Sequence, residues 1–263
     1  MGQSAMGRHG ARALAGAIAV AALSGGCSTT DGLPSATARA TFFPTQVDGN
    51  LTVTQGGLPG SGSRMSVDDD LDLQEDSYGN FALELDDGPL RLGLQYLPFS
   101  YDGSSTLARD VVFHGHTYPA GNDIESDLGL TTWAARVDGA LIQEDDFEVR
   151  LGVGAYWWQF DLELRDRDAA FDDSRKFSRL LPAVTASSFT GFGDGFGIRL
   201  DGAFATLDEG RRLVDASTSV DWEFIDRVHA SLGWRWMRYW LNEDTNRGLL
   251  DLYGPTIGLV IEL

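Results

Sequence analysis

The eleven residues from Phe147 to Trp157, with the sequence FEVRLGVGAYW, decide the fold. One set of alternate positions is apolar, and the set between them is charged or glycine: Phe147, Val149, Leu151, Val153, Ala155 and Trp157 against Glu148, Arg150, Gly152 and Gly154. Because successive side chains of a β-strand point to opposite faces, this stretch predicts a strand with one apolar face and one polar face.

The same alternation recurs along the chain and predicts an all-β protein of about ten strands, within a range of eight to twelve. We expect these strands near residues 38–54, 78–86, 89–101, 127–142, 146–163, 179–192, 195–207, 214–225, 227–241 and 249–263. Tight turns are expected at 86–88, 143–145, 193–194 and 226, and longer, mostly acidic loops at 55–77, 102–126, 164–178, 208–213 and 242–248. Short turns at one rim, long loops at the other and an even strand count are typical of an antiparallel up-and-down transmembrane barrel.

The polar faces of these strands carry arginines and carboxylates together, and inside a narrow barrel such charges must be paired. Arginine suits this role because its planar guanidinium can bind a carboxylate through two hydrogen bonds. The predicted lumen charge network consists of Arg91, Arg136, Asp138, Glu148, Arg150, Arg199, Asp201, Asp221, Glu223 and Arg235. About ten strands filled in this way leave too little room for a wide aqueous pore.

The N-terminus indicates export. Residues 1–26 have the order of a signal peptide: a basic start, the apolar run ALAGAIAVAAL at 13–23, and then small residues. The run is too short for a membrane-spanning helix. The stretch from Leu23 to Cys27 resembles a bacterial lipobox, which implies lipidation of Cys27; cleavage by ordinary signal peptidase is the alternative. We expect a tether at 27–36 and a single barrel domain at 37–263.

The C-terminus carries a further resemblance. Residues 256–263, TIGLVIEL, resemble the β-signal of bacterial outer-membrane β-barrel proteins, although Leu263 replaces the usual terminal aromatic residue. The segments 66–74 and 106–126 also look like parts of uncharacterised barrels of this class. The resemblance implies a Gram-negative outer membrane as location, with outer-membrane lipids and the barrel-assembly machinery as partners.

Composition excludes several classes of function. The net charge is −19 and the pI is near 4.4, so the chain lacks the basic surface that nucleic-acid binding requires. A single cysteine excludes an intramolecular disulfide framework and a CxxC site. The glycines near residue 193 do not have the pattern of a phosphate-binding loop, and we expect no cofactor.

Two weak patterns point to chemistry. His114 and His116, together with Asp110, are candidate ligands for a transition metal, although polar loop histidines are the more common explanation. His229, Ser231 and Glu223 form a nominal hydrolase set, but composition alone does not make a catalytic triad. The acidic run at 68–72 lacks the spacing of a calcium loop. We therefore predict no catalytic residues.

Three hypotheses remain open from the residues alone. The first is a non-enzymatic envelope barrel that anchors, displays a surface or forms a narrow conduit. The second is a barrel enzyme acting on lipid or peptide, which requires a histidine near an acid or serine. The third is a soluble periplasmic lipoprotein with a β-sandwich or lipocalin-like barrel, which predicts an apolar interior and a charged exterior.

Overall fold

The computed structural model describes residues 34–54, 62–73, 76–167, 171–208, 210–242 and 246–263. The predicted signal peptide, Cys27 and most of the predicted tether lie outside these residues. In the part described, no helix is both long enough and apolar enough to cross a membrane.

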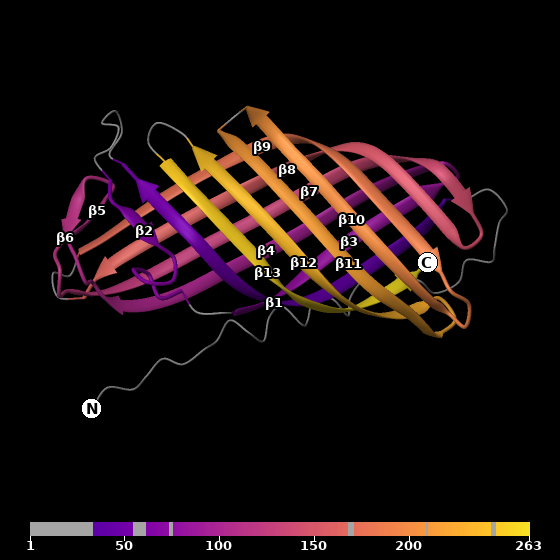
Figure 1. Cartoon of the computed structure of the whole chain (residues 1–263), viewed down its shortest axis with the longest axis horizontal. Coiled ribbons are helices and arrows are strands. Elements are labelled where there is room, and N and C mark those ends of the chain that lie inside the picture. Colours follow the sequence, from indigo (N-terminus) through magenta and orange to yellow (C-terminus); the bar gives the residue numbers. More distant parts are fainter. Residues whose placement is uncertain (1–33, 55–61, 74–75, 168–170, 209, 243–245) are drawn as a thin grey trace.

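Ten antiparallel strands form one closed barrel, which confirms the predicted fold class and strand number (Figure 1). The barrel strands are β1 (Ser35–Val53), β3 (Asp76–Asp87), β4 (Leu90–Thr106), β7 (Asp123–Glu144), β8 (Phe147–Asp166), β9 (Phe171–Gly191), β10 (Phe196–Asp208), β11 (Arg211–Ile225), β12 (Val228–Asn242) and β13 (Asn246–Glu262). Each strand pairs with its neighbours in this order, and β1 pairs with β13 to close the sheet. No strand edge is therefore left open where the circle is complete.

The closing ladder between β1 and β13 has one interruption. Pairs run from Thr37↔Glu262 to Phe42↔Ile257 and resume at Gln46↔Tyr253. Pro44 lies in the gap on β1 and Pro255 lies in the gap on β13. Since proline has no N–H to donate, neither residue can make a full contribution to the ladder.

The two ends of the barrel differ in their connections. The turn end carries the short connections β3–β4, β7–β8, β9–β10 and β11–β12, at the positions predicted for tight turns. The cap end carries three additional short strands: β2 (Arg64–Ser66), β5 (Val111–Phe113) and β6 (His116–Tyr118). The strand β2 pairs with β1, whereas β5 and β6 form a separate hairpin.

The strands reach further toward the cap end than the sequence indicated. The expected loop 164–178 is wrong, because β8 continues to Asp166 and β9 already begins at Phe171. The expected loop 102–126 is likewise shortened at both ends and contains β5 and β6. The polar residues on one side of these extensions suggested loops, yet they alternate with Phe160, Leu162 and Phe177, which face a core. β1 also begins at Ser35, inside the predicted tether.

At the turn end the barrel is apolar outside and charged inside. Leu94, Leu151, Val153 and Leu200 are among many large apolar side chains exposed on the outer wall. Arginines and carboxylates occupy the interior of the same part. This is the arrangement predicted from the alternating strands.

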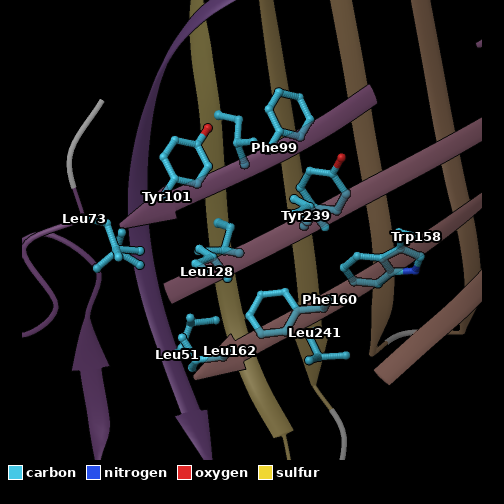
Figure 2. Packing of buried hydrophobic residues seen from close by; sticks show 14 of the residues in the cluster. Leu51, Leu73, Phe99, Tyr101, Leu128, Trp158, Phe160, Leu162, Tyr239 and Leu241 are labelled. Atoms are coloured by element: carbon cyan, nitrogen blue, oxygen red, sulfur yellow. The ribbon is translucent and has the colours of Figure 1, made fainter. Parts of the chain in front are cut away.

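Toward the cap end the polarity reverses. The interior becomes a continuous apolar core in which Tyr101, Leu128, Leu162 and Tyr239 are at most 1% exposed (Figure 2). The outer face carries charged residues such as Lys176. This reversal was not expected from the alternating strands. It combines the predicted barrel with the apolar interior expected for a soluble protein.

The rim at the cap end is uneven. The ladder between β9 and β10 ends at Ala183↔Ala205, whereas β8 and β9 stay paired up to Asp166↔Phe171. In Figure 1 the arrowheads of β10 and β12 stop short of the end that carries β5 and β6, which β8 reaches. The strands β4, β7, β8 and β9 thus form a high wall above the rest of the barrel.

Candidate functional site

The most elaborate polar structure is the ionic cluster inside the turn-end half. Its lowest layer joins Arg91 and Arg150 to Asp86 and Glu148. Nε of Arg150 lies 2.7 Å from Glu148, Nε of Arg91 lies 2.7 Å from Asp86, and Arg91 lies 3.1 Å from Glu148. The Arg150 side chain is 1% exposed. Each cation in this layer therefore contacts two carboxylates, and each carboxylate contacts two cations.

The middle layer is centred on Glu84. Its carboxylate accepts a hydrogen bond of 2.5 Å from Nη2 of Arg136, and Arg199 approaches within 3.7 Å. Arg136 also lies 3.1 Å from Asp138 and 3.4 Å from Asp201. Five charged groups from three strands, β3, β7 and β10, therefore meet across the barrel axis.

Two further contacts extend the network toward the first strand and the apolar core. Asp221 contacts Arg39 at 3.3 Å and also accepts a hydrogen bond of 2.6 Å from Ser231. Higher up, Arg235 donates two hydrogen bonds to Asp215, of 2.9 and 2.5 Å. The hydroxyl of Tyr156 donates to the same carboxylate, and this layer lies next to the core.

Nine of the ten residues predicted for the lumen lie in this cluster, and Glu223 does not. Its carboxylate accepts a hydrogen bond from the backbone N–H of Arg227 at the β11–β12 turn. The prediction omitted Arg39, Glu84, Asp86 and Asp215. Glu84 and Asp86 alternate with Leu83 and Leu85, so the signal that identified the other members was present for them as well.

A cavity of about 110 Å³ lies between the middle layer and Asp215. Its lining includes Arg39, Arg136 and Arg235, with serines and threonines between them. Asn80 also lines the cavity, and neither its amide nitrogen nor its amide oxygen has a hydrogen-bond partner among the residues that the structure describes. A volume of this size holds a few water molecules, which are the natural partners for that amide.

The predicted metal ligands are arranged differently from the expectation. Nδ1 of His114 lies 3.1 Å from Asp173, and Nδ1 of His116 lies 2.9 Å from the other oxygen of the same carboxylate. Asp110 instead accepts a hydrogen bond from the backbone of Ala120. No group of three His, Cys, Asp or Glu residues is placed to hold a metal ion within the part of the chain that the structure describes.

The nominal hydrolase set does not assemble. His229 contacts Glu262 at 3.2 Å, and the hydroxyl of Ser231 donates to Asp221. The carboxylate of Glu223 instead accepts a hydrogen bond from the backbone N–H of Arg227 at the β11–β12 turn. In the acidic run, Asp70 binds Arg109 at 2.7 Å and accepts from the backbone of Ser66, so its charge already has protein partners.

A row of like charges lies on the outer face of the high wall, beyond the exposed apolar side chains. Asp102 and Asp127 are directly paired across β4 and β7, and Asp127 is paired with Glu163 across β7 and β8. Burial, the hydrogen bond with Asp102 and the negative charge nearby raise the pKa of Asp127 from its ordinary value of 3.8 to about 6. Like charges opposite each other on a sheet are destabilising.

We expect Asp127→Asn to raise the melting temperature in detergent at pH 7 but not at pH 4. The folded protein holds a proton on Asp127 more tightly than the unfolded chain, so this group favours folding below pH 4 and ceases to do so as pH rises through 6. Thermal unfolding at both pH values measures the effect. Asp145→Asn in the β7–β8 turn is the control, and an equal response of the two variants would contradict the prediction.

Comparisons with known proteins agree on the fold alone. No family model and no curated protein matches the chain. Among solved structures, the outer membrane protease OmpT from Escherichia coli aligns with 90% of this chain and 99% of its own, with a TM-score of 0.58 and 9% identity. The transport unit of the autotransporter AIDA-I from Escherichia coli (TM-score 0.43, 8% identity, 95% and 97% coverage) and Ail of Yersinia pestis (0.38, 8%, 88% and 99%) match less well. The chain thus has the barrel fold found in outer-membrane proteins.

Proposed function

We propose that this chain is a non-enzymatic β-barrel protein of a Gram-negative outer membrane that is closed to solutes and displays its cap end at the cell surface. The observation that carries the proposal is the reversal of polarity along the barrel axis. An apolar exterior over a charged interior is stable only where hydrocarbon surrounds it, whereas a charged exterior over an apolar core is stable in water.

The height of the apolar zone fits a membrane. On β8 the exposed apolar residues extend from Phe147 to Trp157, beyond which the outer face carries Gln159 and Asp161. The ten steps between these eleven residues, at about 3.3 Å each and tilted by about 40°, span about 25 Å along the barrel axis. That height matches the apolar band of outer-membrane barrels.

Aromatic residues border this zone at both edges. Tyr96, Trp133 and Trp157 are adjacent on β4, β7 and β8 at the cap-end edge. Phe196 and Trp222 stack at the turn-end edge, with ring centroids 5.9 Å apart. Aromatic rings at both borders are typical of the girdles that lie at the level of the lipid headgroups.

The partners of the proposal follow from the same surfaces. Outer-membrane lipids would surround the apolar zone, and Ile257 and Leu259 of the C-terminal segment are exposed within it. This segment would be presented to the barrel-assembly machinery during insertion. Export by residues 1–26 and lipidation of Cys27 remain predictions from the sequence.

We expect the refolded protein to show no stepwise conductance in planar bilayers. The apolar core fills the cap-end half, and the ionic layers cross the turn-end half, so ions find no continuous water path. Single-channel recording at both polarities tests this. Regular current steps that disappear when Leu128 is replaced by tryptophan would reveal a conduit and contradict the closed barrel.

The histidine cluster at the cap end supports a second candidate, a barrel hydrolase. His114 and His116 both lie within hydrogen-bond distance of Asp173, which is the juxtaposition of base and acid that such an enzyme requires. The test is hydrolysis of a panel of fluorogenic peptides and phospholipids. Turnover that Asp173→Ala abolishes would establish this candidate and overturn the non-enzymatic one.

A further inference from the structure

The high wall ends in an unpaired strand edge. Within the described residues, β9 pairs with β8 along its whole length but with β10 only from Ala183 to Gly191. In the described part of the chain, the backbone of β9 from Phe171 to Pro182 therefore has no strand on its β10 side. Strand edges of this length attract other extended chains, because their N–H and C=O groups lack partners in the sheet.

The side chains along this edge carry positive charge beside an apolar ring. Arg175, Phe177 and Arg179 alternate on the inner face of β9, and all three are only partly buried. The guanidinium of Arg179 lies over the ring of Phe177, 5.8 Å from its centroid. Nε of Arg175 is buried without a hydrogen-bond partner among the described residues. Two arginines with an aromatic ring between them favour a ligand that carries one carboxylate on each side of an apolar group.

At the lower end of this edge, β10 residues beyond the last β9–β10 pair are also exposed. Leu207, two residues beyond the last β9–β10 pair, is 54% exposed although it is a large apolar residue. Lys176, the only lysine of the chain, stands on the outer face of the edge and binds Asp161. Charged residues and a proline on an edge disfavour indiscriminate strand pairing, so an added strand needs a matching charge pattern.

A second copy of the chain in the same membrane does not fit this edge. The symmetry axis of such a dimer is parallel to the membrane normal, so both copies of β9 run in the same sense across the bilayer. With a tilt of about 40° the two strands cross at about 80° and cannot form a ladder. The natural occupant is therefore an extended segment of a different protein.

We infer that the edge of β9 from Phe171 to Pro182 binds an extended acidic peptide of a partner protein by strand addition. The peptide would place two carboxylates, four residues apart, beside Arg175 and Arg179, with an apolar residue between them over Phe177. The pattern is acid–x–apolar–x–acid, since alternate residues of a strand share one face. Backbone hydrogen bonds supply affinity and the two arginines supply selectivity.

The inference rests on the proposed function in placing this edge outside the membrane and in excluding a second copy of the chain, and its test uses the whole protein in detergent micelles. The probe is a fluorescein-labelled eleven-residue peptide with Glu-Thr-Val-Thr-Glu at its centre, and binding is followed by fluorescence anisotropy. We expect the double change Arg175→Glu and Arg179→Glu to weaken binding by more than about tenfold. A peptide with Lys-Thr-Val-Thr-Lys at its centre should bind this double variant better than it binds the unchanged protein.

The backbone contribution is tested separately. Two further peptides carry N-methyl groups on alternate residues, one set on each edge of the extended chain. Strand addition predicts that one of the two loses binding and that the other retains it, because only one edge faces β9. Arg247→Glu at the top of β13 is the matched control and should leave binding unchanged.

Three outcomes would overturn the inference: equal binding of both N-methylated peptides, equal binding of the double variant and the unchanged protein, or a dimer cross-linked through residue 176 that excludes the peptide. The melting temperature of the double variant shows whether it folds. The membrane placement is tested independently by the contrast between Val153→Arg on the apolar outer wall and Ser174→Arg beyond it.

Discussion

Replacing Arg150 with leucine is expected to destabilise the folded protein by about 3–5 kcal/mol, because the change leaves buried carboxylates without a partner. The Arg150 side chain is almost fully enclosed and contacts both Glu148 and Asp86. After the substitution Arg91 alone would serve both acids. Thermal or urea unfolding in detergent micelles, followed by electrophoretic mobility, measures the loss.

Two variants give this experiment its controls. Arg165→Leu removes an exposed arginine that contacts Glu125 and Glu163, and it should change stability by less than about 1 kcal/mol. The double change of Arg150 and Glu148 to leucine should recover part of the loss, since it removes one of the stranded charges. If Arg150→Leu unfolds like the unchanged protein, the ionic cluster does not hold the turn-end half together.

Replacing Val153 with arginine is expected to destabilise the barrel by about 2–4 kcal/mol in a bilayer. Val153 is 62% exposed on the outer wall, midway between Phe147 and Trp157. In water such an exposed site accepts arginine with almost no penalty, whereas in hydrocarbon the charge is unsolvated. The yield of folded protein in vesicles and its urea midpoint report the difference.

The matched substitution lies on the same outer wall but beyond the apolar zone. Ser174→Arg on β9 faces the same direction near the cap end and should change stability by less than about 0.5 kcal/mol. The contrast between the two positions separates a membrane barrel from a soluble one. Equal and negligible effects at both positions would favour the soluble lipoprotein.

Most of the fold could be predicted because strand periodicity is a local signal. The apolar and polar alternation around Phe147–Trp157 identified the strands, and the tight turns fixed the strand order. The extensions of β8 and β9 were missed for a physical reason. Alternation has the same appearance on either side of Trp157, but the apolar set lies outside the barrel below it and inside the barrel above it.

The sequence predicts that the interior holds arginines and carboxylates, but it does not predict which of them form ion pairs with one another. Alternation placed ten charged residues in the lumen, and nine of them lie in the ionic cluster. The pairing of Arg150 with Asp86 and of Arg235 with Asp215, however, depends on the tilt and stagger of the strands. The meeting of both cap-end histidines with Asp173 depends on how the β5–β6 hairpin folds onto β9. The unpaired edge of β9 was also invisible, since the relative heights of β9 and β10 follow from the register of the whole sheet.

The pairing of β1 with β13 has a kinetic consequence. Every other contact between barrel strands can form between segments that follow each other along the chain, but this one joins its two ends. Such a contact has the highest contact order in the molecule and brings together residues that diffuse furthest before they meet. The first strand therefore cannot complete its pairing until the last strand has been synthesised and delivered. Because the β1–β13 ladder is interrupted at Pro44, we expect separation of the barrel strands to begin at this junction.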